Sequence, residues 1–547
     1  MISTVVIPVV VLAYAFAYIY RRWTARLSLS DIPGPKSSSF LLGNLSELYA
    51  GAAEADLRWK RTFGPIVRYK GIFKQDHLMI SDPKALRYIL HTSAYRFLKE
   101  TGGSRAPSHL LSGHSLNSVD GEAHRRQRKV MLPAFGGPEA RALFPVFKKI
   151  SQELVARWKD VIFQDTNSQS ESAVFNIPRW LSRATLDAIG EAAFDYQFGA
   201  LDNAETELGK AYANVSMTFF GIPTFSRIFS IALMDCLPSW LVLKLFATLP
   251  NQRYRQMCYT SDVSKRVAKR LVQEKRGAVE LGKASRDVMS LLVKANASTN
   301  PKAQLSDEEL YAEMRIILFA GHETTSTTLT WTLWELAKHR DIQTRVRNEI
   351  REAEAKVQAK GQTELGLSDI ESMPYVQAVL KEALRFHPAI PRIARLVKDD
   401  QVIPLSKPIR TKSGAMLSEL AIPGGTKILL TIAAYNRDEE LWGPDADTFN
   451  PDRWLTSYER NGEYASLGVV GNTMTFSSGT RSCIGWRFAM NEMQCFLVDL
   501  ISNFEFSLPE DGKRIRREVP LLMFPVVEGE VQDGVKLPLR ISIAARD

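Results

Sequence analysis

The sequence contains little that could form disulfides or zinc sites. Four cysteines and eight histidines occur among 547 residues, and the cysteines are all far apart. Isolated thiols provide neither a disulfide framework nor the paired Cys-x-x-Cys spacing that binds zinc. Because disulfides persist in oxidising compartments, this cysteine usage indicates a reducing compartment.

Basic runs with interleaved aromatic residues are also missing, which argues against a nucleic-acid-binding module. The chain is nevertheless basic, with 70 Lys and Arg against 60 Asp and Glu and a formal net charge of +10. A basic protein can bind an anionic membrane or an acidic protein partner. We therefore expect one of these two partners and no nucleic acid.

Charged side chains are absent from residues 1–20, and about 20 apolar residues are enough to cross a bilayer. Arg21, Arg22 and Arg26 follow at once, and the positive-inside rule then places residues 21–547 in the cytosol. The alternative is a cleaved signal peptide, which would carry its positive charge before the apolar run. We predict a transmembrane signal anchor at 1–20, a basic stop and proline-rich hinge at 21–40, and a cytosolic catalytic body at 41–547.

The composition, 45% apolar and 24% charged, is that of a globular protein. Residues 63–82 alternate in polarity and predict an antiparallel hairpin, and a second β-rich region spans 392–435. Segment 405–419 within that region has no assigned role. Helical periodicity dominates elsewhere, with helices expected near 83–91, 124–133, 137–162, 176–192, 204–220, 252–280, 308–339 and 486–500. These patterns predict a mainly α protein with small β-sheets (α+β).

One cysteine has an unusual setting. In the stretch Phe476–Gly485, which reads FSSGTRSCIG, Cys483 lies between Gly479 and Gly485 and two residues after Arg481. Glycines allow tight bends and close approach to a bulky group. The nearby cation and the start of the following helix should lower the pKa of the thiol, and the thiolate is the form that binds metals. The other cysteines lack this setting and are interpreted as ordinary core residues: Cys236, Cys258 and Cys495.

The longest helical pattern contains a run that is unfavourable for a plain helix, Ala320-Gly321-His322-Glu323-Thr324-Thr325. Threonine hydroxyls that bond back to backbone carbonyls, together with a glycine, can loosen a helix and leave room for a small molecule. His322-Glu323 could suggest a zinc helix, but Ser326 stands where the second histidine of that motif belongs. A core helix with a local irregularity is the remaining alternative.

These two stretches resemble the haem-thiolate loop and the acid-alcohol motif of the cytochrome P450 family. The resemblance implies a haem b cofactor with Cys483 as its thiolate axial ligand. It also implies that Glu323 and Thr324 deliver protons during oxygen activation and that Ala320 flanks the haem pocket. Three residues of the cysteine loop would contact the cofactor: Phe476, Arg481 and Gly485.

Two further segments are similar to the scaffold motifs of the same family. Glu382 and Arg385 match its Glu-x-x-Arg motif, and Arg453 lies in a loop like its proline-arginine partner loop. The resemblance implies that the three charges form a buried network behind the haem. Buried charges persist only when they are paired, so we assign this network a structural role.

The haem propionates also need donors. His124 and Arg128 resemble the family's Trp-x-x-x-Arg motif, with a histidine where tryptophan is usual. Histidine also donates a hydrogen bond, so this contact is compatible with the family's pattern. Arg395 occupies a further propionate-binding position by resemblance, with Arg392 as the competing choice.

The implied reaction is monooxygenation of a hydrophobic small molecule, such as a terpenoid, steroid, fatty acid or aromatic xenobiotic, in secondary metabolism or detoxification. No flavin or nicotinamide fingerprint occurs in the chain. Electrons would therefore come from a separate protein. The resemblance implies that this protein is a membrane-bound NADPH-cytochrome P450 reductase, with cytochrome b5 as a second donor. Candidate docking cations are Arg125, Arg126, Lys129 and Arg487. Relatives anchored in this way lie in the endoplasmic reticulum membrane as single-pass proteins.

Two other classes stay open at this point. Some haem-thiolate relatives rearrange peroxides and need no reductase, although they typically depart from the Glu323-Thr324 pattern. A non-catalytic haem-binding protein is the other alternative. Family position also suggests the regions that line the substrate pocket: Ser104–Asn117, Met217–Pro223, Phe319, Ile390–Ala394 and Met523–Pro525.

Overall fold

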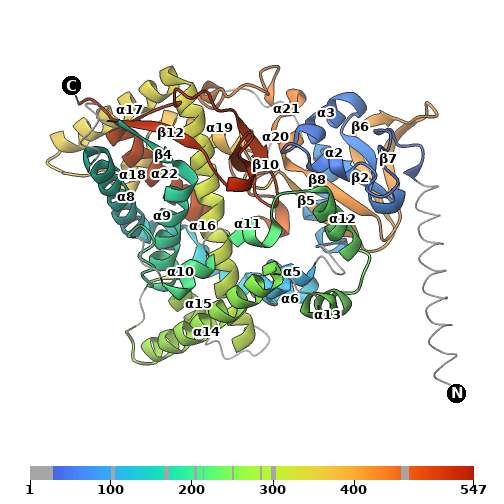
Figure 1. Ribbon diagram of the computed structural model, residues 1–547, viewed down its shortest axis with the longest axis horizontal. Coiled ribbons are helices and arrows are strands. Elements are labelled where there is room, and N and C mark those ends of the chain that lie inside the picture. The colour runs from blue at the N-terminus through green and yellow to red at the C-terminus, as the bar shows by residue number, and fades with distance from the viewer. Residues whose placement is uncertain are drawn as a thin grey trace.

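The computed structural model describes residues 29–99, 105–164, 172–202, 206–212, 215–248, 252–283, 286–296, 304–456 and 467–546. Within these ranges the chain is mainly helical with small sheets (Figure 1), which confirms the predicted fold class. The predicted anchor at 1–20 and most of the basic stop lie outside the described residues. Among the helices in the described ranges, none has the length and apolar character needed to span a membrane.

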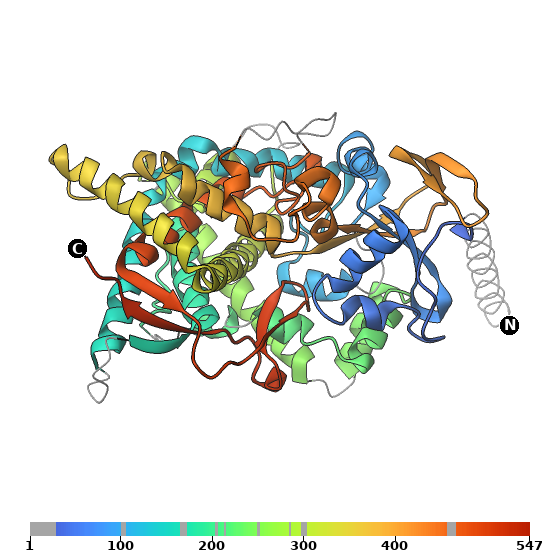
Figure 2. The ribbon, with the colours of Figure 1, turned by 90° about the horizontal axis from the view of Figure 1, so that it is seen from above.

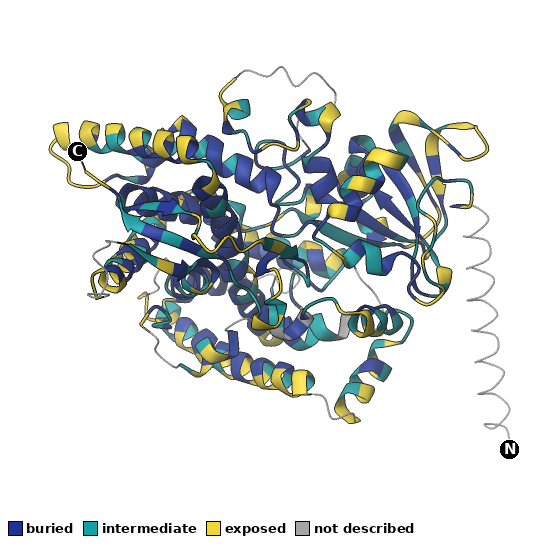
Figure 3. Ribbon diagram, turned by 45° about the horizontal axis from the view of Figure 1, so that its top comes forward, coloured by how far each residue is buried: buried dark blue, intermediate teal, exposed yellow. Residues whose placement is uncertain are grey.

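Helix α16 (Asp307–Lys338) passes through the middle of the helical half of the molecule (Figure 1). It begins with a capping box, in which Ser306 Oγ accepts from Glu309 N at 3.3 Å and Glu309 accepts from Ser306 N at 2.9 Å. Most of its residues are buried (Figure 3), and the buried ones are mainly apolar residues and threonines. A helix buried all round belongs to the core of a large protein.

Long helices pack around α16 and agree with the predicted helices in several places. They are α8 (Phe144–Gln164), α9 (Ile177–Phe194), α14 (Gln252–Glu280), α17 (Arg340–Ala359), α19 (Pro374–Phe386) and α22 (Trp486–Asn503). The predictions at 176–192, 252–280, 308–339 and 486–500 are confirmed to within a few residues. The predicted helix 137–162 is divided, because Pro145 lacks an N–H and starts α8 anew after α7 (Gly137–Ala142).

Shorter helices complete the body. The predicted helix 204–220 is represented by α10 (Glu207–Tyr212) and α11 (Val215–Phe220), and helices α12 (Phe225–Met234) and α13 (Ser239–Thr248) were not predicted. The others are α2 (Leu45–Tyr49), α3 (Glu54–Phe63), α4 (Pro83–Arg87), α5 (Arg105–Ser112), α6 (Gly121–Met131), α15 (Val288–Asn296), α18 (Leu367–Glu371), α20 (Ile432–Asn436) and α21 (Glu439–Trp442).

The largest sheet has the order β1-β2-β8-β5-β3. Strands β1 (Ile66–Lys70) and β2 (Asp76–Ile80) form the predicted hairpin, with Val67 opposite Met79. Strand β8 (Lys427–Thr431) runs parallel to β2, and β5 (Arg392–Val397) lies between β8 and β3 (Phe97–Leu98). The remaining sheets are β4 (Ser172–Asn176) with β12 (Pro538–Ile543) and β9 (Phe504–Ser507), and β10 (Ile515–Glu518) with β11 (Phe524–Val527).

Segment 405–419 belongs to a two-stranded hairpin of β6 (Gln401–Arg410) and β7 (Met416–Ile422), which extends from one end of the molecule (Figure 2). At its turn, Lys412 N donates to Asp31 O at 2.9 Å and Ser413 N donates to an Asp31 carboxylate oxygen at 2.8 Å. The proline hinge is also held, since Arg68 N donates to Pro33 O at 2.9 Å. The hairpin therefore fixes the chain near the predicted hinge.

Candidate active site

A cavity of about 1960 Å³ lies between the helical body and the main sheet. Its lining includes the cysteine loop, one side of α16, and residues of β5. The cavity opens where lining residues such as Thr224, Ser226 and Arg253 are exposed. Small-molecule sites occur in concave spaces of this kind.

The backbone of the cysteine loop follows from its glycines. Gly479 has φ +67°, and a Cβ there would lie 2.1 Å from Leu90 O, so a side chain would collide with the backbone of a neighbouring segment. Cys483 N donates to Phe476 O at 2.8 Å, which closes the loop, and α22 begins at Trp486. Phe476, Cys483 and Gly485 all line the cavity.

Cys483 is surrounded by the rest of the chain, but its side chain is accessible because it lines the cavity. Burial raises the pKa of this thiol, and the Gly485 N–H and the Arg128 charge oppose that shift without reversing it. The prediction that the loop alone lowers the pKa of Cys483 is therefore wrong. A coordinating metal removes the proton outright, so the thiolate would be set by the metal and not by the loop.

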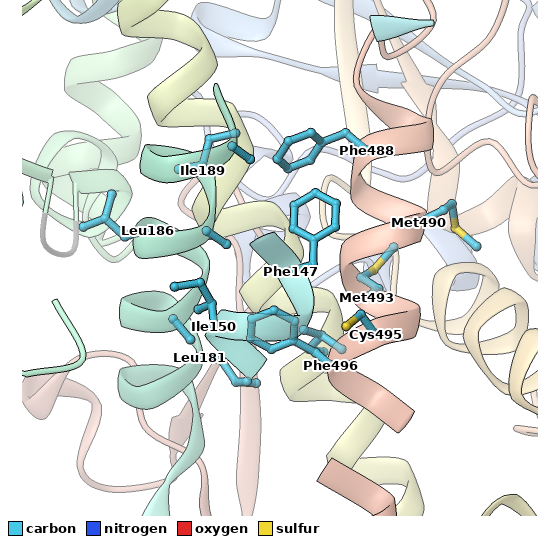
Figure 4. Close-up of a cluster of buried hydrophobic side chains, with 14 of the residues drawn as sticks. Phe147, Ile150, Leu181, Leu186, Ile189, Phe488, Met490, Met493, Cys495 and Phe496 are labelled. Carbon is cyan, nitrogen blue, oxygen red and sulfur yellow. The ribbon is translucent and has the colours of Figure 1, made fainter. Parts of the chain in front are cut away.

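The other cysteines are not comparable. Cys495 is fully buried on α22, among Phe147, Met493 and Phe496 (Figure 4), and Ser151 Oγ lies 3.6 Å from its sulfur. It is absent from the cavity lining. Cys236 touches the cavity but directs its sulfur to Ala232 O at 3.7 Å. Cys483 is thus the cysteine whose thiol is presented on a glycine-containing loop.

The side of α16 that faces the cavity is formed by small and hydroxyl residues. Ala320, Gly321 and Thr324 line it, and Thr324 Oγ1 donates to Ala320 O at 2.7 Å. Thr325 and Thr328 make the same bond to the carbonyls of the residues four positions earlier, at 3.2 and 3.0 Å. Such back-bonding is the interaction that the sequence indicated.

Gly321 also permits a close helix crossing, because a Cβ there would lie 2.6 Å from Ile189 Cδ1 of α9. Despite the predicted loosening, α16 is assigned as one helix from Asp307 to Lys338. His322 is fully buried, with Nδ1 2.8 Å from Leu318 O, and its placement agrees with a core residue and not with a metal ligand.

Glu323 points away from the cavity. Its side chain is buried, its two carboxylate oxygens accept from Ser216 N on α11 at 3.3 and 3.2 Å, and one of them also accepts from Ser216 Oγ. Burial raises the pKa of Glu323 to about 7, and the two Ser216 donors oppose the shift. Its carboxyl therefore titrates near neutral pH, next to Thr324 in sequence but on the other side of the helix.

Basic side chains gather at another part of the cavity wall. The cavity lining contains His124, Arg128 and Arg395, the three residues predicted to serve the propionates, together with Arg481, which was predicted to contact the cofactor from the cysteine loop. His124 is buried, and its Nδ1 lies 3.0 Å from Tyr95 Oη. Burial, and then neighbouring cations, lower the pKa of His124 to about 3, so this histidine is neutral. The contributing cations include all three arginines, which shows that the predicted set converges.

Each of these arginines also has a structural contact. Arg481 donates to Ala94 O at 2.6 Å, to Phe97 O at 2.8 Å and to Asp120 at 2.5 Å, while its Nε is buried without an acceptor. Arg128 donates to Ser482 O at 2.8 Å and so supports the residue next to Cys483. Arg392, the competing choice, is neutralised by Asp56 at 3.0 Å.

Sequence reasoning missed Lys99, which also lines the cavity. Its Nζ donates to Leu116 O at 2.6 Å and Val119 O at 3.0 Å, and burial lowers its pKa to about 7. Two acids lie near the Lys99 ammonium group, Asp120 and Glu313, and Arg481 already binds Asp120. A lysine directly after the short strand β3 gives no signal in a single sequence, because the segment that brings it here is far from the cysteine loop in the chain.

The donor set fits a haem. A thiol faces the cavity from a loop with little side-chain bulk, and a cluster with excess positive charge lies in the same wall, as two propionates require. The orphan Nε of Arg481 is a further unsatisfied donor within that cluster. The residues present are therefore those that a thiolate-bound haem would use.

The Glu-x-x-Arg motif forms the network that the sequence predicted. Arg385 donates to both carboxylate oxygens of Glu382, at 2.8 and 2.7 Å, and Arg453 Nε donates to Glu382 at 3.1 Å. Glu382 also accepts from Asn450 N at 2.8 Å and Trp454 Nε1 at 3.0 Å. Glu382 and Arg385 are fully buried, and neither lines the cavity.

Most of the suggested pocket regions contribute to the cavity. The lining includes Pro107, Leu116, Phe219, Phe319 and Ile390. At the C-terminal end the wall is formed by Val519–Leu522 and not by the suggested Met523–Pro525. Met523 is turned into the core, where its N–H donates to Ala389 O at 2.8 Å and its carbonyl accepts from Trp331 Nε1 at 2.7 Å.

The fold, the cysteine loop and the helix that faces it define a haem-thiolate protein, and comparison with known families agrees. The family model described as Cytochrome P450 matches residues 33–532. The chain belongs to the cytochrome P450 family.

Its relatives include fungal enzymes that it matches over most of their length. Cytochrome P450 monooxygenase 128 of Postia placenta is 33% identical, with 93% of this chain and 92% of the relative covered. Cytochrome P450 monooxygenase claQ of Ampulloclitocybe clavipes is 33% identical, with 88% and 87% covered. The ganoderic acid synthetase of Ganoderma lucidum is 31% identical, with 93% of each chain covered. The predicted enzyme class, a cytochrome P450 monooxygenase, is confirmed.

Proposed function

We propose that the chain oxidises a hydrophobic small molecule in its cavity, with haem held by Cys483 and electrons supplied by a separate reductase. The observation that carries this proposal is the shared cavity: Cys483, the Thr324 side of α16 and the basic cluster all line it. When bound, the haem would supply reductive activation of O₂, helped by electron donation from the thiolate.

The protein residues have distinct tasks. Cys483 would bind the iron, and His124, Arg128, Arg395, Arg481 and Lys99 would hold the propionates. Thr324 offers its hydroxyl to the cavity and could pass a proton to oxygen there, while Ala320 leaves space beside it. By resemblance to the family, Glu323 would supply the proton to Thr324, although its carboxyl is held by Ser216 on the other side of α16. Its pKa of about 7 allows it to gain and lose a proton near neutral pH.

The substrate class follows from the walls. Apolar residues such as Phe219, Ile317, Phe319 and Leu522 line the cavity, so a molecule with a large apolar body is favoured. The relatives are fungal, and one of them is named for a ganoderic acid. A role in fungal secondary metabolism is therefore the best-supported one.

The partner would be a membrane-bound NADPH-cytochrome P450 reductase, with cytochrome b5 as a second donor. Of the four candidate docking cations, Arg125, Lys129 and Arg487 are exposed. Arg126 is excluded, because it is partly buried and donates to Glu309 at 2.5 and 3.0 Å. An acidic reductase face would therefore meet the other three. The apolar residues 1–20 support an endoplasmic reticulum anchor with a cytosolic body.

The test is to replace Cys483 in the full chain and to supply a reductase and NADPH. Cys483→Ser should abolish the red-shifted absorption band of the reduced, CO-bound protein and all oxygen incorporation. Cys258→Ser, a cysteine outside the cavity lining, is the matched control and should keep both. If the Cys483→Ser protein kept the band while Cys495→Ala lost it, the assignment of the ligand would be wrong.

A further inference from the structure

Helix α16 carries another buried acid, Glu313, which the proposed reaction does not use. Glu313 is fully buried, and it forms no ion pair with any basic side chain in the part of the chain that the structure describes. One of its carboxylate oxygens accepts from Leu116 N at 2.8 Å, and the other is buried without a hydrogen-bond partner. Burying a carboxyl group is unfavourable, so this single bond indicates the task of the residue.

Leu116 is held through both polar groups of its backbone. Its N–H donates to Glu313, and its carbonyl accepts from Lys99 Nζ at 2.6 Å. Burial raises the pKa of Glu313 to about 8, although the Leu116 N–H and the Lys99 charge oppose that shift. The carboxyl group is therefore largely protonated at neutral pH, so it holds Leu116 by a hydrogen bond and not by its charge.

A second buried residue of α16 holds the chain just before this point. Arg315 Nη2 donates to Leu110 O, in the last turn of α5, at 2.5 Å and to Ser261 Oγ of α14 at 2.9 Å. The last carbonyl groups of a helix have no partner within that helix, and a cation near them is favourable. Arg315 therefore fixes the end of α5 against α16 and α14.

Between these two contacts the chain turns at Gly113, which has φ +64°. A Cβ placed on Gly113 would lie 3.3 Å from Ala312 Cβ, so the turn lies directly against α16. The stretch from Leu110 to Leu116 is thus positioned by three nearby residues of one helix: Ala312, Glu313 and Arg315.

This stretch belongs to a wall of the cavity. Residues 107–118, called the wall segment from here on, line the cavity from Pro107 and Ser108 to Asn117 and Ser118. Asn117 lines the cavity and is also exposed, so the wall is thin at that point. A displacement of the wall segment would therefore widen the cavity on this side.

We propose that Glu313 is a positioning residue, which holds the wall segment through Leu116 and thereby limits the size of the molecules that reach Cys483. Without this acceptor the Leu116 N–H has no partner inside the protein, which favours states in which the segment has moved and water binds that N–H. The inference rests on the proposed function for the identity of the site that the wall encloses.

Three substitutions of Glu313 separate its hydrogen bond from its acidity. Glu313→Gln keeps an acceptor at the same reach and removes the acid. Glu313→Asp keeps the acid on a shorter side chain that does not reach Leu116 N, and Glu313→Leu removes both. Glu308→Leu, the same change at an exposed position of α16, is the matched control.

The first readout involves no haem chemistry. Hydrogen–deuterium exchange of the peptide that contains Leu116, measured on the haem-loaded full chain, reports how often the wall segment opens. In Glu313→Leu and Glu313→Asp the Leu116 amide should exchange roughly tenfold faster than in the wild type, the factor expected when one hydrogen bond is lost. Glu313→Gln and Glu308→Leu should match the wild type.

The second readout is the size selectivity of the cavity. Imidazole and clotrimazole both bind haem iron through a nitrogen atom, but clotrimazole is much larger. Association of clotrimazole, followed by stopped-flow absorption, should be roughly tenfold faster in Glu313→Leu and Glu313→Asp, whereas the rates for imidazole and CO should change by less than about twofold. A general loss of structure would change all three rates.

Equal clotrimazole rates in the wild type and Glu313→Leu would overturn the inference. So would a Glu313→Gln protein that behaves like Glu313→Leu, because the acid and not the hydrogen bond would then be required. If Glu313→Leu and Glu313→Asp lost the absorption band of the reduced, CO-bound protein, the carboxyl group would serve haem retention and the inference would be wrong. Failure of the proposed function is seen separately, as absence of that band or of oxygenated product in the wild-type chain.

Discussion

Two clusters of charged side chains, one around Glu382 and one around His124, are built in opposite ways. In the cluster of Glu382, Arg385 and Arg453, each charge meets a partner, and Glu382 accepts from five donors. In the cluster around His124, basic residues outnumber acids, and the pKa values of His124 and Lys99 are both lowered. The first cluster is closed on itself, whereas the second is complete only with a bound anion.

The difference separates structural charge from ligand-binding charge. A buried ion that is fully hydrogen-bonded contributes to one arrangement of the chain and gives nothing to a ligand. A buried group of like charges is unfavourable by itself, so its presence indicates that something outside the chain compensates it.

The largest expected effect comes from opening the closed cluster. Arg385→Met leaves Glu382 buried without its two shortest side-chain contacts, and removing one partner of a buried pair costs about 3–5 kcal/mol. We expect a loss of this size in the free energy of unfolding, measured by urea denaturation of the detergent-solubilised chain. A variant that lost haem but kept its stability would contradict the structural assignment.

The environment of Glu323 is intermediate between those of the two clusters, because this buried acid has hydrogen-bond donors but no cation as a partner. Ser216 supplies its bonds, and the neutral His322 and Tyr212 lie in the same buried region. Among the described residues, no basic side chain forms an ion pair with it. Burial raises its pKa from 4.5 to about 7, so the folded chain binds this proton more tightly than the unfolded chain does.

The consequence is a pH-dependent cost. Below the pKa that Glu323 has in the unfolded chain, its carboxyl is protonated in both the folded and the unfolded states, so it does not lower the free energy of unfolding. This free energy decreases as pH rises through the pKa of about 7 that Glu323 has in the folded chain. The free energy of unfolding of Glu323→Gln, measured relative to that of the wild type, should therefore increase by about 3 kcal/mol between pH 4 and pH 8. Glu308→Gln, an exposed acid on the same helix, is the control and should show no such difference. A pH-independent difference for Glu323→Gln would show that the carboxyl is not buried as described.

The features that could be predicted from the sequence are those fixed by local chemistry. The cysteine loop is recognisable because its glycines and arginine are close to Cys483 in the chain, and Glu382 and Arg385 are three residues apart on one helix. The long helices α14 and α16 were predicted almost to their ends, since many residues share one period.

The features that could not be predicted depend on contacts between distant segments. Lys99 reaches the basic cluster only because β3 pairs with β5. The direction of the Glu323 carboxylate is set by Ser216 on another helix, and the pKa of Cys483 is decided by burial. A single sequence shows neither the burial of a side chain nor its neighbours in space.

A substitution in the basic cluster around His124 should weaken haem binding rather than destabilise the fold. Lys99→Met removes one of several like charges, so the free energy of unfolding should change little, while haem should dissociate roughly tenfold faster because a propionate loses a charge-assisted donor. Transfer of haem to apomyoglobin measures this rate, with Lys74→Met, an exposed lysine on the cavity rim, as the control. If Lys99→Met kept its haem but lost much of its stability, Lys99 would have a structural role like that of the charges around Glu382.

The smallest effect is expected immediately beside the closed cluster. Asp452 precedes Arg453 in the chain and binds Arg345 at 2.6 Å, but both side chains are about half exposed. Water screens such a pair, so Asp452→Asn should change the free energy of unfolding by less than about 1 kcal/mol. Measured next to Arg385→Met in the same urea titration, it compares two ion pairs from the same region that differ in burial. A cost for Asp452→Asn close to that of Arg385→Met would show that burial is not what distinguishes the clusters.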